Sequence, residues 1–221
     1  MRPVLRFVAS VLITSGILML IDAALTVTWQ EPVSAFIAQR EQDSLKRQLD
    51  RAPAILAPAR AATAGERDVR KRVRRLAAAW RRHLHTGDPI GRIDLPTLHR
   101  RYVVVQGTDL ETLRKGPGHY PATSLPGQGG TVAIAGHRTT YLAPFRTIDQ
   151  LRPGQPIILD MPYARFTYTV ERTQVVLPTA LWITHRVPGP ERLVLSACHP
   201  LYSASHRIVA FARLRSVALK K

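Results

Sequence analysis

Residues 131–137 read TVAIAGH and residues 193–198 read LVLSAC, and these two stretches indicate the fold most clearly. Each is a short apolar run with a chemically active side chain at its end. Apolar runs of about this length, bounded by turn residues, are typical of buried β-strands, whereas buried helices run longer. We therefore expect His137 and Cys198 at the ends of two strands.

Similar runs occur on both sides of these two stretches. They lie at residues 92–95, 102–106, 156–160, 166–172 and 208–214, and Gly- and Pro-rich turn signals separate them at 115–118, 126–130, 152–154 and 187–190. Seven or eight short strands in this part of the chain predict an all-β sandwich or barrel. The gaps leave room only for short helices near 110–114 and 145–151.

The composition limits the classes of partner. The chain has 221 residues, a formal net charge of +17 and a single cysteine, which cannot form an intramolecular disulfide or a cysteine-rich metal site. The positive charge is consistent with nucleic acid or with an anionic surface as partner. Aromatic residues make up only 6 % of the chain and no strand alternates them with basic residues, so we expect no nucleic-acid partner.

The amino terminus predicts a membrane anchor. Residues 7–29 carry one charge, Asp22, and form a helix long enough to cross a bilayer, with Trp29 at the interface. Arg2 and Arg6 place residues 1–6 in the cytoplasm and the rest of the chain outside, as a single-pass protein of the cell membrane in contact with its lipid. A cleaved signal peptide is the alternative, but no good small-x-small cleavage site follows the apolar run.

Between the anchor and the strands, the sequence predicts two further segments. Residues 30–62 are interpreted as a juxtamembrane stalk, in which Pro53 and Pro58 break any long helix. Residues 63–87 are predicted to form a basic amphipathic helix, with Thr63 and Glu66 as a capping box and Gly87 as a stop.

The apolar stripe of this helix is expected to pack on the domain at residues 88–221, and it consists of Val69, Val73, Leu76, Trp80 and Leu84. The basic faces are interpreted either as solvated or as a contact for anionic lipid or wall polymer.

Three side chains at strand ends carry the candidate chemistry. Cys198 and His137 end their runs, and Arg207 opens the last strand. A cysteine attacks as the thiolate, which a neighbouring imidazolium or guanidinium favours, and a histidine can protonate a leaving amine. An arginine can donate hydrogen bonds to an oxyanion. Acyl transfer through a thioester needs these three roles and neither a metal nor another cofactor.

Each residue also has a structural interpretation. A lone cysteine after an apolar strand is more often a buried small hydrophobe, and His137 is one of eight histidines. Composition and spacing alone leave catalysis and structure as open alternatives.

Three segments resemble a known family. Residues 135–141 (AGHRTTY), 195–200 (LSACHP) and 206–209 (HRIV) are similar, in this order, to the three signatures of sortases, and most similar to class E of high-G+C Gram-positive bacteria. The resemblance covers residues 90–214 and extends to the anchor and stalk.

The resemblance implies a fold and a reaction. The fold is a closed eight-stranded β-barrel with short helices, preceded by a transmembrane helix and a helical stalk. The reaction is cysteine transpeptidation. The enzyme cuts an LPXTG-like sorting signal of a surface protein, LAXTG in class E, between Thr and Gly, leaving a thioester. An amine, usually from a peptidoglycan precursor, then joins the protein to the cell wall.

The resemblance also implies residue roles. Cys198 would be the nucleophile, His137 the general acid and base, and Arg207 the group that stabilises the oxyanion and positions substrate. Tyr141 matches the tyrosine that helps to shape the signal pocket in class E. The segment 171–191, with Leu181 and Trp182, is interpreted as part of the signal groove.

Two departures from the family pattern concern the site. Ala197 stands where the family usually has Thr beside the nucleophile, which removes a hydroxyl from the expected substrate-binding region. His206 adds a second histidine next to Arg207 without a role. The acidic residues beyond position 87 are few and scattered, so we expect no calcium site of the class A kind.

Two alternative functions remain at this point. An L,D-transpeptidase would keep its histidine and cysteine close together near a Ser-x-Gly-Cys run, whereas His137 and Cys198 are far apart in the chain and Ala197 replaces that glycine. A sortase-like module that binds the wall without turnover is the second alternative, motivated by Ala197.

Overall fold

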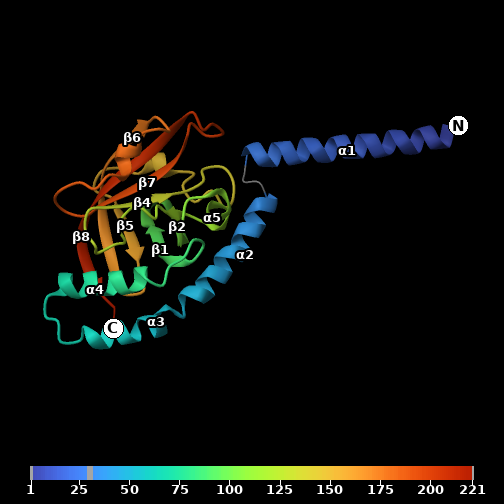
Figure 1. The fold of residues 1–221 in the computed structure, drawn as a ribbon. Coiled ribbons are helices and arrows are strands. Elements are labelled where there is room, and N and C mark those ends of the chain that lie inside the picture. Colours follow the sequence, from blue (N-terminus) through green and yellow to red (C-terminus); the bar gives the residue numbers. More distant parts are fainter. Residues whose placement is uncertain (1, 29–31, 221) are drawn as a thin grey trace.

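The strands close into a barrel in the order β1-β2-β3-β4-β7-β8-β6-β5 (Figure 1). This computed structural model describes residues 2–28 and 32–220; residues 1, 29–31 and 221, among them Trp29, lie outside the described residues. The strands are β1 (Pro89–Leu95), β2 (Arg100–Gln106), β3 (Gly118–His119), β4 (Thr131–Ala135), β5 (Pro156–Asp160), β6 (Ala164–Val176), β7 (Arg192–His199) and β8 (His206–Leu219). The predicted closed eight-stranded barrel is confirmed.

Two strand pairs are parallel, and they fix the geometry of the site. β2 pairs with β3 and β4 pairs with β7 in parallel, while the other neighbours are antiparallel. β4 and β7 are mostly buried, and each has an aliphatic central run, as expected for strands in the middle of a packed sheet. Their parallel pairing brings both carboxyl ends, and the residues that follow, to one end of the barrel.

The interior of the barrel is filled by alternate side chains of these strands. Its largest fully buried members include Tyr163, Phe166 and Tyr168, which pack with Leu193 and Leu195 of β7. A second, smaller apolar cluster lies on another face of β4, β7 and β8, and consists of Ala133, Val176, Ile183, Val194, Val209 and Phe211.

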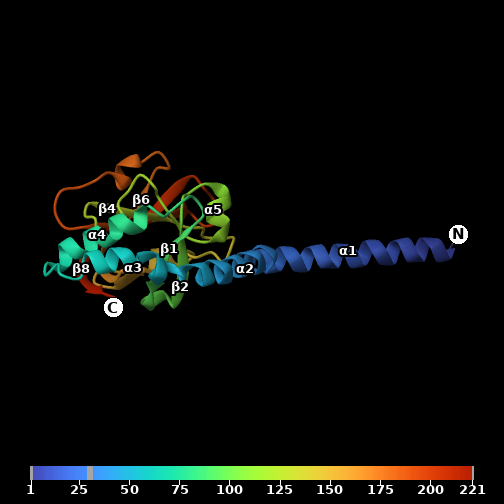
Figure 2. The ribbon, with the colours of Figure 1, turned by 60° about the horizontal axis from the view of Figure 1, so that its bottom comes forward.

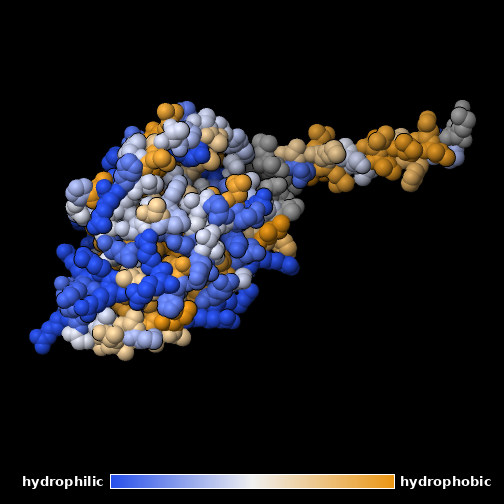
Figure 3. Space-filling view, viewed as in Figure 1, coloured by the Kyte–Doolittle hydropathy of each residue, from blue (hydrophilic) through white to orange (hydrophobic). Residues whose placement is uncertain are grey.

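The first helix, α1 (Arg2–Thr28), projects away from the barrel (Figures 1 and 2). Its segment Pro3–Ala23 is long and apolar enough to cross a membrane. The large apolar side chains of this segment are exposed, and Figure 3 shows α1 as a mostly hydrophobic rod beside a more hydrophilic body. This surface is what a bilayer, and not water, would solvate favourably.

The next two helices, α2 (Pro32–Leu49) and α3 (Ala52–Ala62), lie against the barrel. Leu45, Leu49 and Leu56 belong to the main apolar core. The buried Gln42 side chain accepts a hydrogen bond from the Val103 amide (2.7 Å) and donates one to the Val103 carbonyl (3.0 Å). Because β3 pairs with β2 only at Val105 and Gln106, Gln42 satisfies backbone groups that the sheet leaves open.

Two expectations about residues 30–87 need correction. The helix of residues 30–62 is interrupted between α2 and α3, with Pro53 at the start of α3, but Pro58 lies inside α3 and does not break it, and both helices pack on the barrel. The capping box at Thr63 is wrong, because Thr63 ends α3. The basic helix, α4, is shorter (Val69–Arg81) and begins after Asp68, whose carboxylate accepts hydrogen bonds from the Arg70 and Lys71 amides.

The predicted stripe of α4 does pack on the barrel at its centre. Val73, Leu76 and Trp80 are buried, and the Trp80 indole donates a hydrogen bond to the Ile90 carbonyl (2.9 Å). Val69 is 45 % exposed, and Leu84 lies beyond the end of the helix. Two short elements, α5 (Leu110–Lys115) and the 3₁₀ turn η2 (Ile148–Gln150), occur where short helices are predicted. The remaining 3₁₀ turns are η1 (Pro96–Leu98) and η3 (Leu181–Thr184).

Candidate active site

Strand register brings His137, Cys198 and Arg207 to one end of the barrel. Cys198 of β7 lies directly opposite Arg207 of β8. On the other side of β7, Ala135 of β4 pairs with Ser196, and the Gly136 amide donates a hydrogen bond to the Ser196 carbonyl (3.0 Å). His137 and Cys198 each come two residues after this pair, so they lie at the same level along the direction of the parallel strands.

The alternation of side chains assigns these residues to one face of the sheet. Val194 of β7 and Phe211 of β8 belong to the smaller apolar cluster, whereas Leu193 and Leu195 point into the barrel core. Since successive side chains of a strand point to opposite faces, Cys198 shares the face of Val194, and Arg207 shares that of Phe211. The predicted nucleophile and arginine therefore face the same side, next to the segment that joins β6 to β7.

The imidazole of His137 is half-buried and incompletely bonded. Among the described residues its buried Nε2 has no hydrogen-bond partner. Burial lowers the pKa of His137, and the positive charge of Arg114 lowers it further. Both effects favour the neutral imidazole, which carries one nitrogen that can accept a proton. The His137 ring lies 5.3 Å from the Tyr141 ring, centroid to centroid, so Tyr141 is next to the predicted general acid and base.

The loop after His137 has a strained backbone. Tyr141, Leu142 and Ala143 have φ values of 50°, 64° and 41°, in the left-handed region that costs roughly 1–2 kcal/mol per non-glycine residue. Several contacts hold this conformation: the Tyr141 amide donates to the Ser34 hydroxyl of α2 (3.3 Å), and the Tyr102 hydroxyl donates to the Leu142 carbonyl (3.3 Å). The helix α2 thus supports the loop that carries Tyr141.

Arg138 connects this loop to the end of β7 through its side-chain contacts. The sequence alone does not identify this role. Its side chain is 2 % exposed, forms an ion pair with Asp149 (3.0 Å) and donates to the Arg146 carbonyl (3.0 Å). Its Nη1 atom lies 3.4 Å from the Cys198 carbonyl, to which it donates, and 3.2 Å from His199 Nδ1. A single buried guanidinium thereby fixes the residues that follow both His137 and Cys198.

Tyr120 is a second residue of the site that sequence reasoning missed. Burial is the main cause that raises the pKa of its hydroxyl; a hydrogen bond with Ser196 and the charge of Arg207 oppose the rise, and Cys198 adds to it. All three are therefore neighbours of Tyr120. The only sequence signal was the turn at 115–118 just before it, because β3 is two residues long and shows no alternation.

The Arg207 guanidinium has hydrogen-bond donors that no described protein group uses. Its Nη1 donates to the Ala204 and His206 carbonyls, each at 3.0 Å. Nη2 and Nε have no protein acceptor within the described chain. The guanidinium is therefore held by one nitrogen and can donate hydrogen bonds to a bound group with the others.

The predicted substrate-binding residues have different placements. Trp182 stacks on Phe211 with ring centroids 5.9 Å apart, and Leu181 beside it is 71 % exposed; both lie in η3, near the face of Cys198. Ala197 is 3 % exposed and belongs to the barrel core, so its side chain points away from Cys198. The first residues of the segment 171–191 belong to a strand, because β6 continues to Val176.

Within residues 2–28 and 32–220, no three His, Cys, Asp or Glu side chains lie close enough to hold a metal ion. What the arrangement offers chemically is a thiol, a neutral imidazole and a partly free guanidinium at one end of a barrel.

This combination of fold and site defines a class of protein. A closed eight-stranded barrel with a histidine after β4, a cysteine near the end of β7 and an arginine at the start of β8 is the arrangement expected from the three sequence signatures. A family model described as "Sortase domain" matches residues 93–215, more than half of the chain. The chain belongs to the sortase family.

Known relatives fall in two sortase classes. The chain is 32 % identical over 115 residues to Sortase D of Bacillus subtilis, covering 52 % of this chain and 57 % of that protein. It is 30 % identical over 110 residues to Sortase SrtE1 of Streptomyces coelicolor, covering 44 % and 31 %. The matches thus span less than two thirds of the length of either relative.

The structural similarity extends over the barrel. The structure of sortase E from Streptomyces avermitilis matches with a TM-score of 0.56 and 33 % identity, covering 61 % of this chain and 93 % of that one. These matches confirm the resemblance to class E sortases, and the family match argues against an L,D-transpeptidase.

Proposed function

We propose that the protein is a membrane-anchored cysteine transpeptidase. It cleaves an LAXTG- or LPXTG-like sorting signal between Thr and Gly and transfers the surface protein to an amine of a peptidoglycan precursor or similar acceptor. The observation that carries this proposal is the register of β4, β7 and β8, which gathers His137, Cys198 and Arg207 at one end of the barrel.

The first half-reaction forms a thioester. The Cys198 thiolate attacks the carbonyl carbon of the signal threonine, and the charge moves to the carbonyl oxygen, where the free nitrogens of Arg207 donate hydrogen bonds. The peptide C–N bond then breaks, and His137, which holds the thiol proton, protonates the leaving glycine amine.

The second half-reaction reverses the proton transfer. Neutral His137 takes a proton from the incoming amine, which attacks the thioester, and the Cys198 thiolate leaves. The lowered pKa of His137 suits this step, because the imidazole returns readily to its neutral form. Water as acceptor would give hydrolysis of the same thioester.

Neighbouring groups are assigned supporting roles. Tyr141, held beside His137, and Leu181 and Trp182 of η3 are proposed to contact the sorting signal, since they border the candidate site and keep exposed or half-exposed surface. At position 197 only the backbone is available to substrate, because the side chain is in the core.

The proposed topology follows from α1. The apolar segment Pro3–Ala23 spans the membrane, with the amino terminus in the cytoplasm and the barrel outside. Ser34 at the start of α2 contacts Tyr141, so the barrel end with Cys198 is proposed to lie near the outer membrane surface.

The test uses the full chain in a non-ionic detergent, with an LAXTG peptide and triglycine as amine. We expect a ligated product from the wild-type protein and none from Cys198→Ala. His206→Ala is the matched control, because His206 is exposed next to Arg207 on the opposite face of β8, and this variant should keep its activity. Product formation that survives Cys198→Ala would contradict the proposal. Wild-type protein without product would favour the module that binds without turnover.

A further inference from the structure

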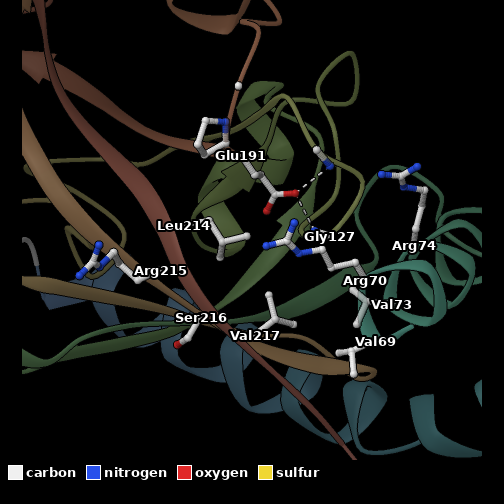
Figure 4. Close-up of a pocket in the computed structure, with 13 residues that line it drawn as sticks. Val69, Arg70, Val73, Arg74, Gly127, Glu191, Leu214, Arg215, Ser216 and Val217 are labelled. Atoms are coloured by element: carbon white, nitrogen blue, oxygen red, sulfur yellow. Dashed lines mark hydrogen bonds between the residues drawn. The ribbon is translucent and has the colours of Figure 1, made fainter. Parts of the chain in front are cut away.

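A cavity of about 580 Å³ lies at the barrel end opposite to Cys198 (Figure 4). It lies between α4 and β8 and reaches Glu191, the residue before β7, while Cys198 is near the end of that strand. At a rise of about 3.3 Å per residue, β7 separates the cavity from the candidate active site by roughly 20 Å. The volume is in the range of ligand-binding pockets, about 300–1,000 Å³.

Three arginines line this cavity without a protein partner. Arg70 and Arg74 are one turn apart on α4, and Arg215 projects from β8 (Figure 4). None of the three guanidinium groups forms a hydrogen bond or an ion pair within the described part of the chain. Their guanidinium donors are therefore available to an anion.

Three neighbouring cations outside the cavity are paired. Lys71 and Arg75 of the same helix lie 3.4 and 3.8 Å from the Glu66 carboxylate, and Arg213 of β8 forms an ion pair with Glu171. On α4, Lys71 and Arg75 are therefore neutralised by Glu66, whereas Arg70 and Arg74, which line the cavity, are not.

The one acidic residue of the cavity is already satisfied. The buried Glu191 carboxylate accepts hydrogen bonds from the Tyr168 hydroxyl (2.6 Å) and from the Gly127 and Gly129 amides (both 2.8 Å). Burial raises the pKa of Glu191 as the main effect, although these hydrogen bonds oppose it. Glu191 therefore holds the glycine loop in place, and the free charges of the cavity are all positive.

The walls are partly apolar. Val69 and Val73 of α4 face Leu214 and Val217 of β8 across the cavity (Figure 4). A ligand that carries negative charge on a short carbon chain would match both parts, since arginine recognises phosphate oxygens and the valine and leucine side chains contact carbon atoms.

We propose that this cavity binds the phosphodiester groups of an extended polyol-phosphate polymer outside the membrane. The same chemistry occurs in anionic lipid headgroups, but the placement favours a polymer. Ser34, close to the end of the membrane segment, contacts Tyr141 at the Cys198 end of the barrel. α4 lies on the far side of the barrel from α1 in both views (Figures 1 and 2). The site would hold the catalytic domain against an anionic wall while the opposite end receives substrate.

Calorimetric titration of the full chain in a non-ionic detergent with a glycerol-phosphate oligomer tests this site. Arg70→Gln/Arg74→Gln removes two charge-assisted contacts and should raise the Kd at least about tenfold. Lys71→Gln/Arg75→Gln removes the same charge from the same helix but outside the cavity, and should change the Kd less than about twofold. Equal effects of the two double variants would overturn the proposal, because binding would then depend on overall charge.

Two further measurements address the cavity and the ligand source. Ser216→Tyr places a ring among the lining residues without changing the charge, and should also weaken binding; unchanged binding would overturn a role for the cavity. Dihexanoylphosphatidylglycerol below its micellar concentration should bind more weakly than the oligomer, and the reverse order would assign the site to lipid and contradict the proposal. No peptide is present in these titrations, so their failure leaves the proposed transpeptidation unaffected.

Discussion

Glu191 and His137, at opposite ends of the barrel, differ in how their buried polar atoms are bonded. At the Glu191 end, each carboxylate oxygen has a donor from Tyr168, Gly127 or Gly129. At the Cys198 end, a buried nitrogen of His137 has no partner within the described residues, and the thiol is free. A buried polar group without a partner costs free energy, so its retention on a histidine at the same end of the barrel as Cys198 points to a role in binding or chemistry.

This difference separates stability from activity. Changes at the Glu191 end should weaken the fold, whereas changes at the Cys198 end should reduce the reaction and leave the fold intact. The following predictions test this separation.

His137→Gln should reduce the rate of peptide ligation by about 10³-fold or more, since it removes both proton-transfer steps. Its unfolding temperature should equal that of wild type, because the unpartnered nitrogen contributes no hydrogen bond. Ligation kinetics and thermal unfolding in detergent check the two halves. His206→Gln is the control for both, and a large loss of stability in His137→Gln would contradict the comparison.

Glu191→Ala should lower the free energy of unfolding by about 3 kcal/mol, since it leaves the Tyr168 hydroxyl and two glycine amides without an acceptor. Glu171→Ala, which breaks the more exposed pair with Arg213, should cost less than about 1 kcal/mol. Denaturant titration of both variants gives the values. Similar losses in the two would show that Glu191 is not the structural anchor of its end.

Arg138→Gln should lower kcat by about 10- to 100-fold with little change in KM, because the segments after His137 and Cys198 lose their common tie and misalign. Arg138→Lys should not restore the rate, since lysine cannot make this set of planar contacts. The rate at which Cys198 is alkylated at fixed pH should differ between Arg138→Gln and wild type, because the thiol is misaligned. Arg152→Gln, which loses a hydrogen bond to the Asp149 carbonyl, should be alkylated at the wild-type rate. The same alkylation rate in both variants would contradict a positioning role for Arg138.

Arg114→Gln should raise the pKa of His137, because the cation that disfavours its protonated form is removed. Burial still lowers this pKa, so it should remain below the usual histidine value. An NMR titration of the His137 ring measures the shift, with Arg215→Gln at the other barrel end as control. A lower pKa in Arg114→Gln would have the wrong sign.

Much of the barrel could be predicted because its strands follow simple rules. β4 and β5 have the predicted bounds, since each is an apolar run between glycine or proline turns. β3 has two residues and therefore no periodicity to detect. The start of α4 was misplaced because Thr63 and Glu66 fit a capping pattern locally, while tertiary contacts extend α3 to Ala62 and leave Asp68 as the cap. The packing of α2 depends on hydrogen bonds from the Gln42 side chain to Val103 of β2, which lies 61 residues further along the chain. No local sequence pattern shows such a contact.

The site was predictable only where reactive side chains lie at either end of an apolar run. His137 and Cys198 follow such runs and Arg207 precedes one, and the strand register brings the three residues together. Arg138 and Tyr120 have no such signal, because their importance comes from contacts across the fold. Ala197 seemed important through its position next to Cys198, yet the alternation of β7 turns its side chain into the core.

The central claim is that Cys198 forms a thioester with a cleaved sorting signal. Intact-mass measurement after acid quenching tests it directly, with the full chain and an LAXTG peptide in the absence of an amine. The wild-type protein should gain the mass of the whole peptide less that of the released glycine fragment, and Cys198→Ala should gain nothing. A wild-type protein without adduct, or an adduct that persists in Cys198→Ala, would contradict the account.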